Sequence, residues 1–329
     1  MRKTILVAGG AGYVGAHACL ALAEAGFSPV VYDNLSSGHA DFVQWGALEV
    51  GDIRDAARLD AVIARHAPAA VLHFAGLIEV GESVRAPGRF YDINVAGSLT
   101  LIEAARRGGV EAMVFSSTCA TYGDPVRLPM DEDHPQAPLN PYGRTKLVIE
   151  QALADYSTYA GFRSVCLRYF NAAGADEAGR IGERHEPETH AVPLALQTAL
   201  GQRQGFCLYG DDYDTRDGTA VRDYVHVSDL ADAHVRALTY LLEGGRTTAV
   251  NLGTGAGTTV RELIETVRRT TNRPFPVAVA ARRAGDAPCL VADNSRAREV
   301  LGWTPTRTLD DIVRTAWRWH AAELDRAAR

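Results

Sequence analysis

A tyrosine and a lysine four residues apart, Tyr142 and Lys146, form the pattern with the most specific chemistry in this sequence. On a helix, residues i and i+4 share one face, so an ammonium group at Lys146 can stabilise a phenolate at Tyr142. A free phenol has a pKa of about 10, and a fixed cation lowers that pKa toward the working range of a general base. Upstream, Ser116-Ser117-Thr118 ends an apolar stretch, where its hydroxyls could reach the same substrate oxygen. These residues predict proton transfer at a hydroxyl group.

A glycine triplet near the N-terminus predicts a cofactor for this chemistry. Gly9, Gly12 and Gly15 lie between an expected strand and an expected helix, and Asp33 ends the next expected strand. Such glycines let the backbone approach a pyrophosphate, and the helix N–H groups and dipole bind its charge. Asp33 can accept hydrogen bonds from an adenosine ribose. Asn34 follows it where an arginine would bind an extra phosphate, so the sequence favours NAD over NADP.

A second glycine-rich turn, Gly253-Thr254-Gly255-Ala256-Gly257, also precedes an amphipathic stretch. It could be a second phosphate loop, but it comes late in the chain and lacks a following strand that ends in an acidic residue. We therefore interpret it as a structural turn.

The elements that must position these residues alternate between short aliphatic runs and longer amphipathic stretches. Expected elements span residues 4–8, 16–25, 29–33, 56–66, 70–74, 97–107, 112–116, 141–159 and 163–169. This alternation predicts a doubly wound α/β fold, in which helices cover both faces of a parallel sheet. We expect a Rossmann, NAD-binding lobe mainly over residues 1–174. A smaller mixed α/β substrate lobe should occupy mainly residues 175–329, with part of residues 222–255 returning to the first lobe.

Composition excludes several classes of function. The 329 residues are 47% hydrophobic and 22% charged with a net charge of −6, which describes a globular chain without the basic footprint of nucleic-acid binding. The apolar stretch at the N-terminus is interrupted by glycines, so no membrane segment is expected. Five scattered cysteines without a Cys-x-x-Cys pair favour a reducing cytoplasm.

No metal site is expected. His185 and His190 lie in a charged segment over residues 183–190, but their spacing matches no ligand motif. His73, at the end of a strand, is interpreted as a hydrogen-bonded core histidine. Cys119 is interpreted as a small residue near the pocket rather than a nucleophile.

With these motifs the chain resembles the extended short-chain dehydrogenase/reductase family, and within it the UDP-galactose/UDP-glucose 4-epimerases. The closer resemblance rests on His73-Phe74-Ala75-Gly76, Val80-Gly81-Glu82-Ser83, Arg168-Tyr169-Phe170-Asn171, residues 218–227 and Arg282-Arg283-Ala284-Gly285-Asp286. It implies an NAD-dependent isomerase that inverts carbon 4 of a UDP-sugar through a transient 4-keto intermediate. It also implies a homodimer paired through helices around residues 97–107 and 141–159.

The resemblance assigns roles to individual residues. Thr118 matches the family's catalytic Ser or Thr, Tyr142 the acid/base, and Lys146 the residue that binds the nicotinamide ribose and lowers the pKa of the tyrosine. Cofactor positions are matched by Gly9, Gly12, Tyr13, Val14, Gly15, Asp33, Asn34, Asp52, Ile53, Phe74, Ala75, Asn94, Ser116, Tyr142, Lys146 and Tyr169. Positions around the UDP-sugar are matched by Thr118, Asn171, Tyr209, Arg222, Arg283, Asp286 and Leu290. Two guanidinium groups suit a diphosphate, because their planar donor forks match its oxygens.

Three positions depart from the family pattern or leave it open. Ala8 replaces the usual Thr before the first glycine, which predicts a slightly looser turn. Ile78 replaces a lysine that in some epimerases reaches the cofactor ribose, so the resemblance carries over neither that contact nor very tight retention of NAD. Leu290 aligns with a position at the sugar end of the pocket that is large in some epimerases and small in others. The choice among hexose, N-acetylhexosamine and pentose, such as UDP-xylose or UDP-arabinose, therefore stays open.

Two alternative functions share the fold. Nucleotide-sugar dehydratases and decarboxylases place carboxylates directly after the catalytic hydroxyl, whereas Cys119 and Ala120 follow Thr118 here. A non-catalytic dinucleotide-binding protein would not need the Tyr142–Lys146 pair, and both residues are present. The sequence favours the epimerase over both alternatives.

Overall fold

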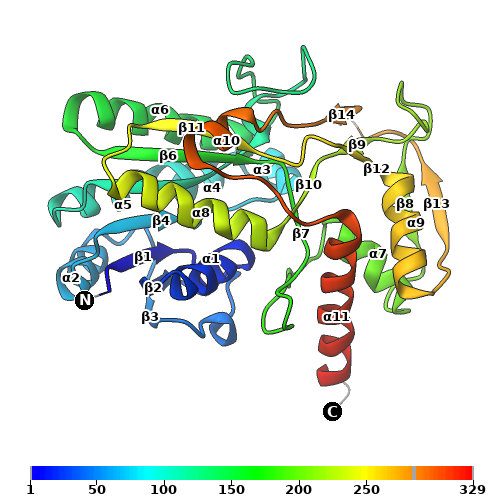
Figure 1. Ribbon diagram of the computed structural model, residues 1–329, viewed down its shortest axis with the longest axis horizontal. Coiled ribbons are helices and arrows are strands. Elements are labelled where there is room, and N and C mark those ends of the chain that lie inside the picture. The colour runs from blue at the N-terminus through cyan, green and yellow to red at the C-terminus, as the bar shows by residue number, and fades with distance from the viewer. Residues whose placement is uncertain (1, 284–286, 328–329) are drawn as a thin grey trace.

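The structure, a computed structural model, describes residues 2–283 and 287–327, which form two lobes (Figure 1). The larger lobe contains a seven-stranded sheet in which all neighbouring strands are parallel. From edge to edge its strands are β3 (Ala47–Val50), β2 (Ser28–Asp33), β1 (Thr4–Ala8), β4 (Ala70–His73), β5 (Ala112–Thr118), β6 (Arg163–Tyr169) and β11 (Thr248–Leu252). The predicted doubly wound α/β fold is confirmed.

The order of the strands reverses between β1 and β4. From β1 the chain proceeds to β2 and β3 on one side, then returns to β4 on the other side and continues to β5 and β6. In sheets of this kind, ligands bind beyond the carboxyl ends of the strands at the point of reversal. The topology therefore predicts a ligand-binding crevice where β1 and β4 end.

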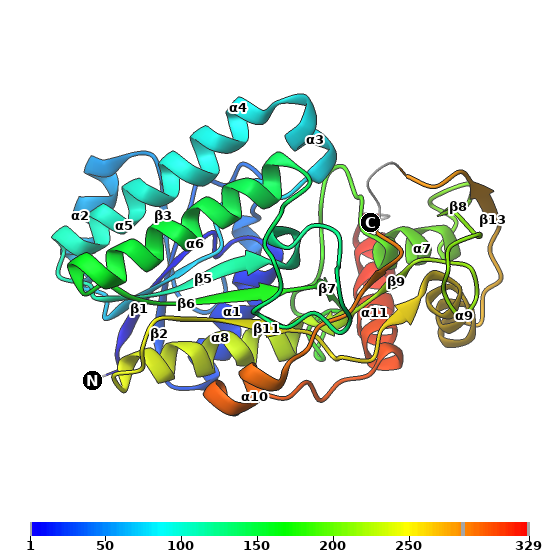
Figure 2. The same ribbon diagram turned by 90° about the horizontal axis from the view of Figure 1, so that it is seen from above.

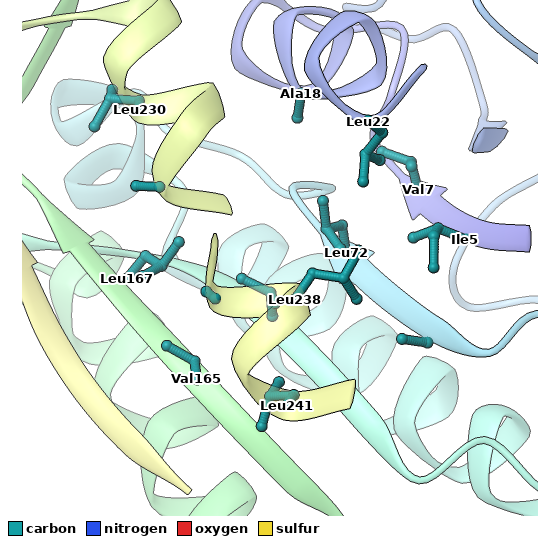
Figure 3. Close-up of a cluster of buried hydrophobic side chains, with 14 of the residues drawn as sticks. Ile5, Val7, Ala18, Leu22, Leu72, Val165, Leu167, Leu230, Leu238 and Leu241 are labelled. Atoms are coloured by element: carbon teal, nitrogen blue, oxygen red, sulfur yellow. The ribbon is translucent and has the colours of Figure 1, made fainter. Parts of the chain in front are cut away.

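Helices cover both faces of the sheet (Figure 2). One face packs against α1 (Tyr13–Glu24), α8 (Val227–Leu242) and α10 (Ser295–Leu301), and the other against α2 (Ala56–His66), α5 (Ser98–Arg107) and α6 (Pro141–Ala160). Strand residues alternate between the two cores, because successive side chains of a strand point to opposite faces. Ile5 and Leu72 pack with Leu238 on the first face (Figure 3), whereas Leu6 and Val71 belong to the second.

Both ends of helix α6 are defined by the sequence. The side chain of Asn140 accepts a 2.9 Å hydrogen bond from the N–H of Gly143, and Pro141 occupies the first helical position, which needs no donor. Gly161 ends the helix in the left-handed conformation, with φ of 68°. This start places Tyr142 in the first turn, next to the carboxyl edge of the sheet.

The smaller lobe is mixed α/β and lies beyond the carboxyl ends of the sheet strands (Figure 2). Its helices α7 (Ala191–Ala199), α9 (Val260–Thr271) and α11 (Leu309–Ala327) share one apolar core. Its short strands pair as β7 (Asn171–Ala173) with β10 (Tyr224–His226), β8 (Phe206–Tyr209) with β13 (Val277–Ala280), and β9 (Val221–Arg222) with both β12 (Thr258–Thr259) and β14 (Cys289–Leu290).

The expected element ranges agree with the structure to within a few residues. Beyond residue 169 no element ranges were predicted; before it, the elements that the sequence did not predict are η1 (Ala40–Phe42), β3, α3 (Val80–Arg85), α4 (Pro87–Phe90), the π-helical η2 (Tyr91–Gly97) and η3 (Cys119–Thr121). They are short, and β3 is an edge strand with largely exposed side chains, so their apolar periodicity is weak. No helix in the described ranges is long and apolar enough to cross a membrane.

Candidate active site

The glycine turn after β1 packs so closely that side chains are excluded. A Cβ atom on Gly9 would lie 2.4 Å from the backbone nitrogen of Ala75, and one on Gly15 would lie 2.2 Å from the carbonyl oxygen of Gly9. Gly9 also has φ of +80°, which glycine adopts without strain. Among the described residues no side chain caps α1 at Gly12, so N–H groups of its first turn remain for an anion. This turn fits the pyrophosphate of a dinucleotide.

Asp33 supports this turn from the end of β2. Its Oδ2 accepts a 3.0 Å hydrogen bond from the N–H of Ala11, and its Oδ1 accepts one of 2.8 Å from Leu35. Burial raises the pKa of the carboxyl group, while these two bonds oppose the shift. Each carboxylate oxygen can accept further bonds, so Asp33 can both brace the turn and bind a ribose.

The other predicted cofactor residues line the same edge of the sheet. The N–H groups of Phe74 and Ala75 both bond to the carbonyl oxygen of Ala8, which fixes the loop after β4 beside the turn. Asn34 donates a 3.0 Å hydrogen bond to Asp52. Tyr13 donates a 2.6 Å hydrogen bond from its hydroxyl to the carbonyl oxygen of Gly174. This bond from Tyr13 links the cofactor turn to the smaller lobe. Val14, the next residue, is half-buried.

Two of these residues have other partners within the protein. The amide of Asn94 bonds to both backbone groups of Leu77, at 2.7 and 3.0 Å, and donates to the Thr145 hydroxyl at 3.1 Å. Asn94 therefore braces the loop after β4 against α6. Ile53 is buried and packs so closely on Gly97 that a Cβ there would lie 2.7 Å from it. The structure gives both residues a part in shaping the crevice.

The predicted catalytic residues converge at the ends of β5 and β6. Tyr142 lies near Thr118, whose hydroxyl acts to lower the pKa of the phenol. Ser116 and Tyr169 share a 2.6 Å hydrogen bond between their hydroxyls. Lys146 is buried, and its Nζ donates a 2.8 Å hydrogen bond to the carbonyl oxygen of Ser116.

Burial dominates the electrostatics of this group. It raises the pKa of the half-buried Tyr142 well above its ordinary value; the Tyr169 phenol adds to the shift and the Thr118 hydroxyl opposes it. Burial also lowers the pKa of Lys146 to about 8. The expected lowering of the Tyr142 pKa by Lys146 is therefore not found within the protein alone, because the ammonium is directed at the Ser116 carbonyl.

The expectation that all three hydroxyls of residues 116–118 reach one substrate oxygen is wrong for Ser117. Adjacent strand residues point to opposite faces, so Ser117 faces away from the site and donates to the carboxylate of Glu150. Glu150 forms a buried ion pair with Arg168 at 2.5 Å, and Arg168 also donates to the Tyr122 hydroxyl at 3.0 Å. This pair was not predicted from the sequence, although Arg168 belongs to one of the stretches that carry the resemblance.

Predicted substrate residues come from several strands of the smaller lobe. Arg222 lies directly opposite Leu290 in the β9–β14 pair. Burial raises the pKa of Cys119 in η3 to about 12, and the charge of Arg222 opposes that rise. The guanidinium of Arg283 lies 3.8 Å from the ring centroid of Tyr209. Asn171 begins β7, immediately after Tyr169 and Phe170. Asp286 lies outside the described residues.

Three further interpretations are confirmed. The carboxylate of Asp223 accepts hydrogen bonds from the N–H groups of Thr254 and Gly255, at 2.7 and 3.0 Å, so the second glycine turn is structural. His73 is buried and its Nε2 lies 2.7 Å from the Ser98 hydroxyl, as expected of a core histidine. The raised pKa of Cys119 makes its thiol a poor nucleophile.

One cluster lies outside this site, in the charged segment over residues 183–190 for which the sequence predicted no metal. Glu183, His185, Glu188 and His190 bring one possible ligand atom each to within 4.8 Å of one another. No helical or strand periodicity aligns them, because the segment that carries them is an irregular loop before α7.

Comparisons with known proteins agree with the geometry of the crevice. The model of the NAD dependent epimerase/dehydratase family matches residues 5–253. A UDP-glucose 4-epimerase of Rhizobium meliloti (strain 1021) is 65% identical over 319 residues, 97% of each chain. The crystal structure of UDP-glucose 4-epimerase from Brucella ovis in complex with NAD is 52% identical, with a TM-score of 0.94 over 96% of this chain and 97% of that one.

A third relative was crystallised with a sugar nucleotide. It is the UDP-glucose-4-epimerase from Stenotrophomonas maltophila with bound NAD and formylated UDP-arabinopyranose, 41% identical, with a TM-score of 0.96 over 99% of this chain and 100% of that one. Each identity extends over nearly the full length of both chains. The chain therefore belongs to the NAD dependent epimerase/dehydratase family and, within it, to the UDP-glucose 4-epimerases.

Proposed function

We propose that this protein inverts carbon 4 of a UDP-hexose and so interconverts UDP-glucose and UDP-galactose, with NAD as its cofactor. The observation that supports this most directly is the convergence of Tyr142, Thr118 and the buried Lys146 at the carboxyl edge of the sheet, beside a glycine turn that fits a dinucleotide. A phenol and a hydroxyl that lie near each other can bind one substrate oxygen and transfer its proton.

In this proposal Tyr142 removes the proton of the sugar 4-hydroxyl, while Thr118 hydrogen-bonds the same oxygen. When bound, NAD supplies an acceptor for the hydride on carbon 4 and a positively charged ring beside the phenol. Tyr142 can then ionise in spite of its burial, because a nearby positive charge stabilises a phenolate. Lys146 contributes a second charge and a fixed position, since its Nζ is bonded to the Ser116 carbonyl.

Inversion would require that the keto sugar presents its other face before carbon 4 is reduced again. Arg222 and Arg283 would bind the diphosphate, and Tyr209, already stacked with Arg283, would lie at the uracil. Asn171 and Leu290 would border the sugar. With the nucleotide bound in this way, the hexose can rotate about its bond to the phosphate. Tyr142 then returns the proton to oxygen 4 of the sugar, whose configuration at carbon 4 is now inverted.

A UDP-pentose is the alternative that a specific observation favours, because the relative from Stenotrophomonas maltophila was crystallised with formylated UDP-arabinopyranose. Dehydratase or decarboxylase chemistry is disfavoured by Cys119 and Ala120, which occupy η3 where those enzymes need carboxylates.

The test is to incubate purified protein separately with UDP-galactose, UDP-N-acetylgalactosamine and UDP-xylose and to follow the 4-epimers by NMR. We expect conversion of UDP-galactose and its loss in Tyr142→Phe. If no sugar is converted even with added NAD, while a 4-keto-6-deoxy product or carbon dioxide forms from related substrates, the proposal is wrong. A protein that binds NAD but converts nothing would be a non-catalytic relative.

We further propose that the protein is a cytoplasmic homodimer paired through α5 and α6, which lie side by side on one face (Figure 2). A shallow hollow of about 360 Å³ on α6 is bordered by Ala152, Tyr156 and Tyr159, and Tyr159 is 85% exposed. All five cysteines are free, which suits a reducing compartment. Light scattering should give twice the chain mass, and Tyr159→Glu should reduce it.

A further inference from the structure

Four side chains in the loop between β7 and α7 are directed at one point. They are Glu183, His185, Glu188 and His190, and their ligand atoms all lie within 4.8 Å of one another. The Glu183 side chain is only 3% exposed. That of His190 is 44% exposed, but its Nδ1 atom is covered by protein. The point at which they meet is therefore shielded from bulk water.

The four facing atoms have no hydrogen-bond partner among the described residues. They are Glu183 Oε1, His185 Nδ1, Glu188 Oε2 and His190 Nδ1. Buried polar atoms are nearly always hydrogen-bonded, whereas in the described part of the chain these four side chains have only one another as ion-pair partners, so their convergence needs an explanation. The imidazole and carboxylate atoms are close, but their contacts lack the alignment of a hydrogen bond.

The spacing of these atoms matches the coordination sphere of a small cation. A tetrahedral ion bound at about 2.0–2.1 Å by nitrogen and oxygen has ligand atoms separated by about 3.3 Å. From Glu183 Oε1, the Nδ1 atoms of His185 and His190 lie 3.3 and 2.7 Å away, and Glu188 Oε2 lies 3.8 Å from His185 Nδ1. These three separations lie on either side of the expected edge length, and all four ligand atoms lie within 4.8 Å of one another.

Backbone N–H groups of the loop fix the carboxylate of Glu188. The other oxygen of Glu188, Oε1, accepts hydrogen bonds of 2.8 and 2.9 Å from the N–H groups of Thr189 and His190. Outer bonds of this kind orient the carboxylates and imidazoles that bind metals. Oε2 lies 3.8 Å from His185 Nδ1, and Oε1 also lies 3.3 Å from His190 Nδ1, so both oxygens of Glu188 border the cluster.

We propose that Glu183, His185, Glu188 and His190 bind one divalent transition-metal ion, Zn²⁺ above the others. Two imidazoles and two carboxylates suit Zn²⁺, and the two carboxylate charges balance it when both histidines are neutral. Because the protein fills all four positions, the site is structural and has no position open for a substrate.

The position of the site indicates what the ion stabilises. The His185 ring lies edge-on to Tyr13 of the cofactor turn, with 6.2 Å between ring centroids, and the Glu183 carbonyl accepts a 3.0 Å bond from Trp319 of α11. His190 precedes α7 and, with Asn171, lines a small cavity of about 40 Å³. The ion would thus fasten the loop where the cofactor turn, α7 and α11 meet.

The first measurement is the metal content of protein purified without a polyhistidine tag and dialysed against metal-free buffer. We expect about one zinc per chain. The variant Glu188→Gln should lose it, whereas Glu186→Gln, an exposed carboxylate in the same loop, should retain it as the matched control. The wild type should also lose several degrees of its unfolding midpoint on treatment with a strong chelator and regain them with Zn²⁺.

A second measurement avoids dependence on a variant that fails to fold. Chelated wild-type protein titrated with Co²⁺ should show the intense visible absorption of a tetrahedral ion, saturating at one equivalent. Neither readout requires catalytic activity. The proposal is overturned if the protein neither contains nor takes up stoichiometric Zn²⁺ or Co²⁺, or if Glu188→Gln folds and binds the metal as the wild type does. The cluster would then be a set of ion pairs with protonated histidines.

Discussion

The Nζ atom of Lys146 donates a 2.8 Å hydrogen bond to the carbonyl oxygen of Ser116, two residues before Thr118, whose hydroxyl we propose to be catalytic. The bond crosses from α6 to the end of β5 and keeps an ammonium group buried under the site. A lone buried ammonium is costly, which is why the pKa of Lys146 falls from 10.5 to about 8. The buried position keeps a positive charge near the groups that we propose to react, and perturbed pKa values of this kind are typical of functional sites.

This burial makes stability depend on pH. Lys146 releases its proton at lower pH in the folded chain than in the unfolded chain, so between about pH 8 and 10.5 the unfolded state binds more protons. The free-energy cost of burying the Lys146 ammonium is fully present below pH 8, and it disappears as the pH rises toward 10.5. The free energy of unfolding of the NAD-free wild type, relative to Lys146→Met, should increase by up to about 3 kcal/mol between pH 7 and 10.5. Urea unfolding measures it, and a constant difference would contradict the assigned shift.

The hydroxyls of Tyr142 and Thr118, which we propose to be catalytic, should differ in how much they contribute to kcat. Tyr142 transfers the proton, so Tyr142→Phe should lower kcat by about 10²–10⁴-fold. Thr118 assists through one hydrogen bond, so Thr118→Val should cost less, and Thr118→Ser should restore most of the rate. Initial rates with UDP-galactose give these values, with far-ultraviolet circular dichroism as a control for folding. Equal losses in Thr118→Val and Thr118→Ser would show that the hydroxyl is not what matters.

The glycine turn offers a test of NAD binding. In Gly15→Ala the new methyl group would collide with the carbonyl oxygen of Gly9, which is 2.2 Å away. We expect a distorted turn and loss of NAD from the purified protein, measured by absorbance after acid release. Gly88→Ala is the matched control, because a Cβ there meets nothing within 4 Å. Retention of NAD in Gly15→Ala would mean that the turn can relax.

Sequence and structure agree where periodicity sets the geometry. Tyr142 and Lys146 could be placed together because four residues make about one helical turn, and the ends of parallel strands meet at one edge. The orientation of Ser117 also follows from strand alternation, once the strand is known to extend to Thr118. The ligand cluster around Glu183 could not be derived in this way, because loop dihedrals have no repeat. The direction of the Lys146 bond depends on tertiary packing that no local pattern records.

The buried pair of Glu150 and Arg168 should be essential for stability. Both side chains are less than 10% exposed, and removal of one partner leaves the other charge unpaired in the interior. Arg168→Met should lower the free energy of unfolding by about 3–5 kcal/mol. The exposed pair of Asp232 and Arg236 is the comparison, where Arg236→Met should cost less than about 1 kcal/mol. Similar losses in the two variants would contradict the importance of burial.

Leu290 should influence which sugar is accepted. It packs with Tyr122, Phe170 and Cys119 beside the strand that carries Arg222, at the sugar end of the proposed pocket. Shortening it to alanine removes three carbons and makes room for an N-acetyl group. Because one or two methylenes in a pocket change discrimination by about 10–200-fold, Leu290→Ala should raise kcat/KM for UDP-N-acetylgalactosamine relative to UDP-galactose by at least about 10-fold. Val126→Ala, at a 70% exposed position, should leave that ratio unchanged. If Leu290→Ala also leaves it unchanged, another residue sets the size of the pocket and Leu290 serves only the apolar cluster behind it.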